Sequence, residues 1–145
     1  MKRLFFGVSA AATIVLTAFP PQTRAEQDDG HVRFVNKLSQ SVEVRIFAKT
    51  GELHKKERIK PGNGDGFHFS GCTDRTRKFE IRLVSDDTLV GSGTFQFEGM
   101  VEPGIAGMND CDLKLKKPEW SSSSGYSLTF HKVSEKRGRF TAKSE

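Results

Sequence analysis

Short stretches in which hydrophobic and polar residues alternate recur along most of the chain. The pattern is clearest at residues 42–47 and 79–83, where every second side chain is apolar. A period of two places the apolar side chains on one face of a β-strand, so each stretch predicts an antiparallel strand with one buried and one wet face. Comparable stretches lie at 31–34, 67–69, 88–97, 113–116 and 126–131, and a weaker one, interrupted by Lys55-Lys56, at 53–59.

Turn-forming residues separate these stretches. Runs rich in Gly, Asn, Asp, Ser and Pro occur at Asn36–Gln40, Pro61–Gly66 and Ser121–Gly125, and such residues favour tight turns. After residue 25, no stretch of ten or more residues shows a helical period. The sequence therefore predicts an all-β protein: a single small antiparallel β-sandwich, or a flattened barrel, of seven or eight strands.

The first 25 residues have the three parts of a secretory signal peptide. Lys2-Arg3 precedes an apolar run of about 16 residues, and Thr23 and Ala25 supply small side chains before the expected cleavage point. The run is short for a membrane span, which needs about 20 residues. We expect residues 1–25 to be a cleaved signal peptide and the protein to be secreted, or periplasmic in a bacterium, without a transmembrane segment.

Charge is nearly balanced in the rest of the chain. Of the 23 Lys and Arg residues, three lie in residues 1–25, which leaves 20 against 18 acids. Four of these bases and two acids lie in Glu135–Glu145, which we expect to be a flexible basic tail after a β-sandwich domain over residues 26–134. So small an excess gives no support to a nucleic-acid partner.

Two cysteines, Cys72 and Cys111, remain after the signal peptide. In an oxidising compartment an even number of cysteines predicts a disulfide. Free thiols or a reactive cysteine are the alternatives, and no Cys-x-x-Cys pair indicates zinc or redox chemistry.

One connection, Gly99–Asp110, is longer than the others and carries apolar residues without alternation. Met100, Ile105 and Met108 are its candidate contact residues. Loops of this length are often functional. The simpler interpretation is a crossover between the two sheets that the disulfide fixes, and the two roles are compatible.

Trp120 is the only tryptophan, and it follows Lys116-Lys117-Pro118. Tryptophan is enriched in interaction hot spots, so Trp120 on a loop could anchor a partner, or it could cap one end of the sandwich. Phe47 is a second candidate contact, because it lies on the wet face if Val44 and Ile46 point inward. The bases around Trp120 that could attract an acidic surface are Lys114, Lys116 and Lys117.

Catalytic and metal-binding motifs are missing from the sequence. There is no Gly-x-Ser-x-Gly and no His-Glu-x-x-His. His31, His68 and His131 occupy polar strand positions and could ligate a metal only if the fold brought them together. Asn109, Asp110 and Asp112 could bind calcium together with backbone carbonyls of the same loop, but no EF-hand pattern supports this. We therefore expect no enzyme, no cofactor and no metal site.

Two stretches resemble families of secreted recognition proteins. His31–Ser39 with Ile59–Gly62 and Phe67–Phe69 resembles the opening of the plant self-incompatibility-protein family. Asn109–Leu113 with Pro118–Trp120 is similar to the closing segment of fungal effectors of the MAX type. Both resemblances imply a disulfide-bonded β-sandwich that acts by recognition rather than catalysis, and neither assigns site residues.

The function predicted from the sequence is that of a secreted, non-enzymatic binding module. Its partner is expected to be a protein, for example one of a host, as for an effector or virulence protein. The alternative is a β-sandwich that binds carbohydrate or an anionic lipid surface through Trp120 and the neighbouring lysines. The third possibility is a small hydrolase or metal-dependent enzyme on the same scaffold.

Overall fold

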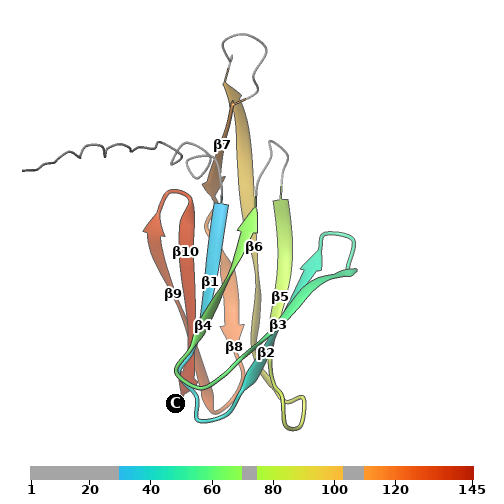
Figure 1. Cartoon of the computed structure of the whole chain (residues 1–145), viewed down its shortest axis with the longest axis vertical. Coiled ribbons are helices and arrows are strands. Elements are labelled where there is room, and N and C mark those ends of the chain that lie inside the picture. The colour runs from blue at the N-terminus through green and yellow to red at the C-terminus, as the bar shows by residue number, and fades with distance from the viewer. Residues whose placement is uncertain (1–29, 70–74, 103–109) are drawn as a thin grey trace, which may run out of the picture.

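The computed structural model describes residues 30–69, 75–102 and 110–145, which form two packed β-sheets (Figure 1). Sheet A has the strand order β4 (Gly64–Phe69), β1 (Gly30–Asn36), β10 (Arg137–Ser144) and β9 (Tyr126–Ser134). Sheet B has the order β3 (Leu53–Ile59), β2 (Val42–Ala48), β5 (Arg75–Leu83), β6 (Leu89–Glu102) and β7 (Asp110–Leu115). A sixth strand of sheet B, β8 (Glu119–Ser122), pairs with β6 over residues 91–94. The predicted all-β fold with two sheets is confirmed, with ten strands in the described ranges instead of seven or eight.

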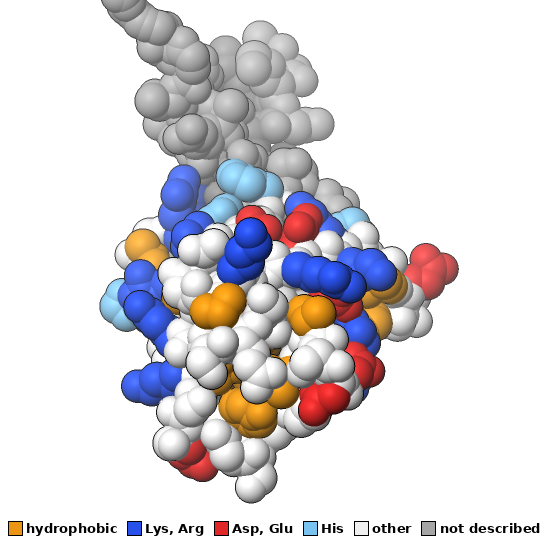
Figure 2. Space-filling model, turned by 60° about the horizontal axis from the view of Figure 1, so that its bottom comes forward, with side chains coloured by type: hydrophobic (Ala, Val, Ile, Leu, Met, Phe, Trp, Pro, Cys, Tyr) orange, Lys and Arg blue, Asp and Glu red, His pale blue; other side chains and the backbone are white. Residues whose placement is uncertain are grey.

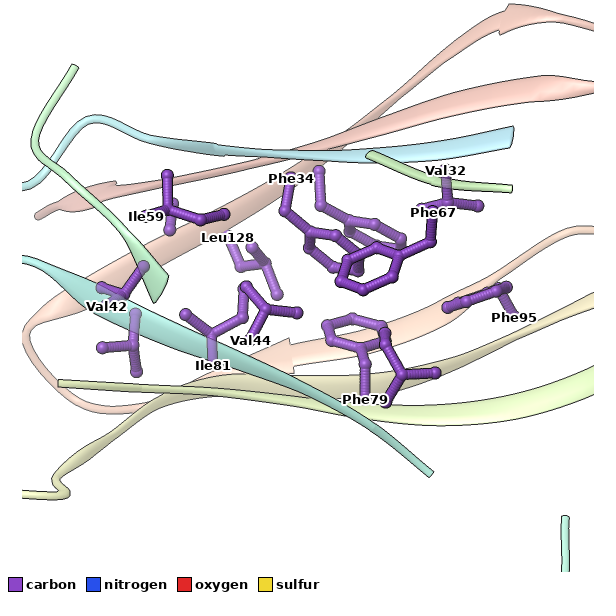
Figure 3. Packing of buried hydrophobic residues seen from close by; sticks show 14 of the residues in the cluster. Val32, Phe34, Val42, Val44, Ile59, Phe67, Phe79, Ile81, Phe95 and Leu128 are labelled. Carbon is purple, nitrogen blue, oxygen red and sulfur yellow. The ribbon is translucent and has the colours of Figure 1, made fainter. Parts of the chain in front are cut away.

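Phenylalanine side chains fill the space between the sheets. Phe34 on β1 and Phe140 on β10 are stacked with ring centroids 5.4 Å apart, and Phe79 on β5 approaches them at 5.2 and 4.6 Å. Figure 3 shows Phe34 and Phe67 pointing from sheet A toward Phe79 of sheet B. All are at most 2% exposed, as the period-two pattern requires of inward positions.

The final strand corrects one prediction. Residues 135–145 were expected to form a flexible tail, yet Arg137–Ser144 is strand β10, with β1 on one side and β9 on the other. Phe140 and Ala142 on β10 are at most 1% exposed. Four basic residues hid a short alternating pattern, in which Gly138, Phe140 and Ala142 face the core.

β10 also makes the sheet mixed. It runs parallel to β1, with Phe34 opposite Phe140, while its pairing with β9 is antiparallel. A wholly antiparallel sandwich was predicted because the last strand was not recognised. The first and last described strands are therefore neighbours.

Strands β6 and β7, on either side of residues 103–109, are neighbours in one sheet, so the sequence-based crossover between sheets is wrong. β6 continues to Glu102, and its residues 97–102 pair with β7, with Glu102 opposite Asp110. Both strands belong to sheet B. The lack of alternation in this segment concealed the extended ladder.

Asn36 is a fully buried polar residue at the end of β1. Its Nδ2 donates hydrogen bonds to the carbonyls of Gln40 and Ile59, at 2.8 and 3.0 Å, and its Oδ1 accepts one from the Leu38 N–H at 2.9 Å. These bonds stabilise the turn between β1 and β2 and join it to the end of β3. A buried amide is tolerated here because both of its polar atoms have partners.

The first testable prediction concerns Phe140. Phe140→Ala should lower the free energy of unfolding by about 3–5 kcal/mol, because it leaves a cavity between the sheets. The measurement is urea denaturation followed by circular dichroism. Val133→Ala on β9, where the side chain is 54% exposed, is the control and should change stability by less than about 0.5 kcal/mol. A flexible tail would give Phe140→Ala the same small effect as the control.

Candidate functional site

A pocket of about 280 Å³ lies beside β9, where this edge strand of sheet A approaches β8 of sheet B. Its apolar lining comes from Leu115, Pro118, Trp120 and Phe130. Three lysines, Lys116, Lys117 and Lys132, complete the lining. The pocket therefore combines apolar walls with positive charge, and it brings together three of the residues that the sequence singled out.

Trp120 is anchored in one orientation. Its ring lies 5.7 Å from Phe130 and 5.9 Å from Phe140, and its Nε1 donates a hydrogen bond of 2.8 Å to the Leu128 carbonyl. The residue nevertheless remains 40% exposed. A ring that is already fixed loses little side-chain entropy when a ligand contacts its free surface.

Trp120 lies on strand β8 and not on a loop as predicted. Gly93 on β6 is the residue that permits this pairing. A Cβ on Gly93 would lie 2.8 Å from the Trp120 Cα and 2.9 Å from the Phe79 ring. The sequence analysis did not foresee that these backbones approach so closely, and a larger residue at position 93 would push β8 away.

Two lysines of the pocket, Lys116 and Lys132, form only weak ion pairs with neighbouring acids. Lys116 lies 3.2 Å from Glu98, but both side chains are about half exposed. Lys132 is 3.9 Å from Glu135, again with both side chains more than half exposed. Exposed ion pairs of this kind are worth at most about 1 kcal/mol, so an incoming anion can compete for either lysine.

The remaining sequence candidates lie elsewhere. Lys114 is exposed, sits on β7 opposite Glu98, and does not line the pocket. Phe47 is half-buried on β2, where its neighbours across the strands are Leu53 and Lys78. Strands β5 and β6 lie between β2 and β8, which carries Trp120. The fold therefore separates Phe47 and Lys114 from the pocket.

Several predicted residues cannot be placed. Cys72, Ile105, Met108 and the expected signal peptide lie outside the described residues. Met100 and Cys111 belong to β6 and β7, but their side chains are also outside the described part. The disulfide and the contact role of the 103–109 segment stay predictions.

Among the pocket residues that the sequence analysis did not single out, Phe130 and Lys132 are the most distant in sequence from Trp120. Phe130 and Lys132 come from β9, whose alternating pattern was recognised, but a pattern along one strand does not show which other strand lies nearby. Phe130 and Lys132 pair with Phe140 and Gly138 of β10, on the inward side of sheet A.

The histidines do not form a metal site in the described residues. His31 on β1 and His68 on β4 are neighbours, with ring centroids 4.7 Å apart. His131 lies on β9, separated from β1 by β10. Within residues 30–69, 75–102 and 110–145, no group of three or more His, Cys, Asp or Glu side chains could hold a metal ion.

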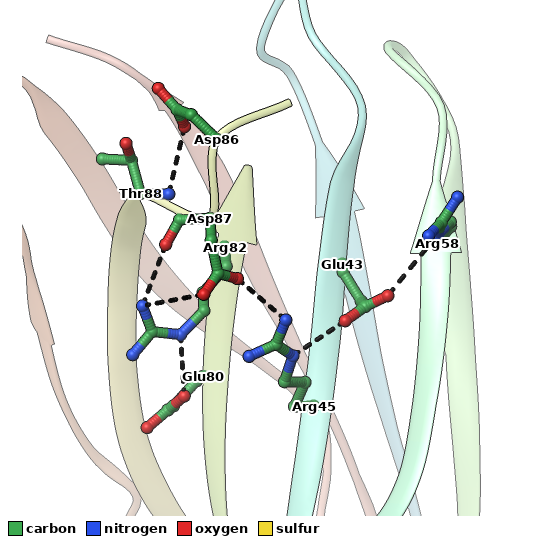
Figure 4. A network of polar contacts seen from close by, with 8 residues as sticks. All are labelled: Glu43, Arg45, Arg58, Glu80, Arg82, Asp86, Asp87 and Thr88. Atoms are coloured by element: carbon green, nitrogen blue, oxygen red, sulfur yellow. Dashed lines mark hydrogen bonds and ion pairs between the residues drawn. The ribbon is translucent and has the colours of Figure 1, made fainter. Parts of the chain in front are cut away.

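Charged residues of opposite sign form a network on the outer face of sheet B (Figure 4). Arg45 binds Glu43 and Asp87, each at 2.8 Å, and Arg82 binds Glu80 at 2.9 Å. Glu43 also lies 3.5 Å from Arg58. These acids and arginines form ion pairs with one another. We therefore interpret the cluster as stabilising the fold rather than as a binding site.

Glu43 is the most buried member of this network, at 8% exposed. The hydrogen bond from the Arg45 guanidinium is the main reason that the pKa of Glu43 lies below its ordinary value, and Arg58 and Lys56 lower it further. Partial burial acts in the opposite direction but does not prevail.

Other surface features narrow the choice of site. On the face drawn in Figure 2, hydrophobic side chains lie in small separate patches among charged and other polar residues. In the part of the chain that the structure describes, no helix has the length and apolarity needed to cross a membrane. The Trp120 pocket is therefore our candidate functional site. A scan against known protein families and a search of curated proteins both find no match.

The pKa of Glu43 leads to a prediction about acid stability. Since its pKa is lowered in the folded protein, Glu43 stabilises the fold above its unfolded pKa of about 4.5, and this contribution is lost as the pH falls through the folded value. Glu43→Gln should therefore cost about 1–2 kcal/mol at pH 7 and progressively less below pH ~4.5.

Urea denaturation of both proteins between pH 7 and pH 3 measures this difference. Glu52→Gln, at an exposed turn position, is the matched control and should follow the parent at every pH. A Glu43→Gln difference that stays constant down to pH 3 would contradict the proposed charge interaction.

Proposed function

We propose that this protein is a secreted, non-enzymatic binding module that recognises a protein partner through the Trp120 pocket. The observation that carries the proposal is the pocket lining, in which a fixed, 40% exposed tryptophan lies among three lysines. The partner segment that fits this chemistry has an apolar side chain flanked by Asp or Glu. The apolar side chain enters the pocket and the acids contact the lysines.

The chemistry of the pocket favours recognition over catalysis. Lysine ammonium groups and aromatic rings provide charge attraction and apolar contact. Leu115, Pro118 and Phe130 add further apolar surface. The proposal therefore assigns no catalytic residue.

The proposal includes a disulfide between Cys72 and Cys111. Its support is the even number of cysteines after residue 25 in a chain that we expect to be secreted. The bond closes the loop from residue 72 to residue 111. On the chain-entropy model, closing this loop stabilises the fold by about 4 kcal/mol.

Peptide display on the immobilised oxidised protein tests the recognition proposal. Enriched peptides are expected to contain an apolar residue next to acids, and they should change the fluorescence of Trp120, the only tryptophan. Trp120→Ala and, separately, Lys116→Glu with Lys117→Glu should each weaken binding about tenfold or more, the loss expected for a hot-spot residue.

The matched control for the lysine pair is Lys49→Glu with Lys60→Glu, which reverses two exposed charges remote from the pocket. It should leave binding within about twofold, as rim-exposed charges contribute little. The double lysine variant keeps the test valid if Trp120→Ala is unstable. Equal losses in the two charge-reversed pairs would show general charge attraction and would contradict the pocket assignment.

The disulfide gives a separate prediction. The protein purified under oxidising conditions should be lighter by two hydrogens than the reduced protein in intact mass spectrometry. Reduction should lower the free energy of unfolding by about 2–5 kcal/mol. Two free thiols in the oxidised preparation would count against it.

A second candidate function is binding to carbohydrate or to an anionic lipid surface through the same pocket. The half-exposed Trp120 ring favours it, since sugars stack on such rings and lysines attract lipid headgroups. Co-sedimentation with anionic vesicles should then be weakened by Trp120→Ala and by charge reversal at Lys116 and Lys117, and binding to neutral glycans should be weakened by Trp120→Ala. Unchanged retention in these variants would exclude it.

A further inference from the structure

The outward side chains of the four strands of sheet A carry positive charge without negative charge. Its four strands are entirely described, and alternate residues of each point away from the core. The outward positions that titrate or carry charge hold His68 on β4, His31 and Arg33 on β1, Arg137, Arg139 and Lys143 on β10, and His131 on β9. None of the outward positions on these four strands holds Asp or Glu.

The strand registers arrange these side chains in two rows across the sheet. In the first row, His31 lies between His68 and Arg137. In the second row, Arg139 lies between Arg33 and His131. Neighbours within a row are about 4.8 Å apart at the backbone, and the two rows are separated by two residues, about 7 Å.

Such an arrangement is unfavourable for the protein alone, because like charges opposite each other on neighbouring strands destabilise a sheet. The effect is visible at His31, whose pKa is lowered first by partial burial and then by His68, Arg137 and Arg33. Among the described residues, the acids beside these strands do not lie on the face. Asp65 bonds the Gly66 N–H, and Glu135 lies in the β9–β10 turn beside Lys132. An anion placed over the two rows would relieve this repulsion.

Two glycines on β4 keep the face shallow. A Cβ on Gly64 would lie 2.9 Å from Nη2 of Arg33, and a Cβ on Gly66 would collide with the imidazole of His31. The side chains of Arg33 and His31 therefore lie over the backbone of β4 rather than pointing directly away from the sheet. The result is an open cationic surface at the side of the molecule, over which an extended chain can lie.

We propose that the outer face of sheet A binds a linear acidic polysaccharide, with Arg33 and Arg139 as its central contacts. Arginine presents its donors as a planar fork that matches the paired oxygens of a carboxylate or sulfate group. Groups repeated along a polysaccharide can meet the two rows together, so several weak contacts add up.

The same face fits nucleic acid and membranes less well. Binding of single strands relies on aromatic side chains on which bases stack, and no Phe, Tyr or Trp occupies an outward position of these four strands. The apolar residues at outward positions near the rows are Val35 and Val133, which offer little to insert into a bilayer.

This site is distinct from the Trp120 pocket. On β9, Phe130 and Lys132 point to the pocket, while His131 points to the opposite side. Variants on one surface therefore leave the other intact, and the two proposals fail separately.

Binding of the oxidised protein to heparin, polygalacturonate and neutral dextran tests the proposal. Arg33→Gln with Arg139→Gln should weaken binding to both acidic polysaccharides about tenfold or more, the loss expected when about two charge-assisted contacts are removed. Lys49→Gln with Lys78→Gln, at two exposed positions that belong to neither proposed surface, is the matched control with the same change in charge, and it should alter binding less than about twofold. Dextran should not bind, and circular dichroism should show that both variants fold.

The pH dependence adds a second readout. The pKa of His31 is lowered from its ordinary value of 6.5, first by partial burial and then by His68, Arg137 and Arg33. Arg139 and His131 face the ligand from the second row. Affinity should therefore rise as the pH falls below about 6.5, because His31 then gains its charge. His31→Gln should flatten this rise.

Three outcomes overturn the proposal. Parent-like binding by the arginine variant would show that the face is not used. Equal losses in the arginine and lysine pairs would show general charge attraction. Tighter binding to single-stranded DNA or to anionic vesicles than to either polysaccharide, at the same salt concentration, would assign the face to another class of ligand.

Discussion

The contact of Phe140 with Phe34 and Phe79 joins the two sheets, and much of the molecule depends on it. Phe140 comes from the last strand and Phe34 from the first described strand, which run parallel side by side. Since contacts so distant in sequence close a large loop, the core is complete only when the end of the chain has joined it. The same ring lies against Trp120, so the core and the floor of the candidate site share one side chain.

Strand β9 shows how one element serves two surfaces. Because successive side chains point to opposite faces, Phe130 and Lys132 line the pocket while Thr129 and His131 face outward. A slip of one residue in the β9–β10 register would exchange these two sets. The pairing of Phe130 with Phe140 inside the core fixes the register, and thereby fixes which residues each surface presents.

Local patterns were sufficient to predict the strands, but not their neighbours. Alternation at 42–47 and 79–83 predicted β2 and β5 because each has one buried face. The alternation pattern did not predict β10, because four bases there indicated a solvated tail. It also did not predict the end of β6, residues 99–102, where hydrophobic and polar residues no longer alternate. Lys116, Lys117 and Trp120 were recognised as candidates because of their sequence proximity to one another. Phe130 and Lys132 join them only through sheet packing, which no local pattern contains.

The arginines on the outer faces of the two sheets have neighbours of different charge. On sheet B, Arg45 and Arg82 each lie within ion-pair distance of an acid on the same face, and Glu43 lies opposite both Arg58 and Arg82 in the strand registers. On sheet A, Arg33 lies opposite Arg139, and Arg137 lies opposite His31. The chain after residue 25 has almost as many acids as bases, so composition does not force this separation. A solvent-exposed face is more stable when neighbouring strands carry opposite charges, as on sheet B, than when they carry like charges. The positively charged outer face of sheet A therefore favours a role in binding an anion over a role in folding.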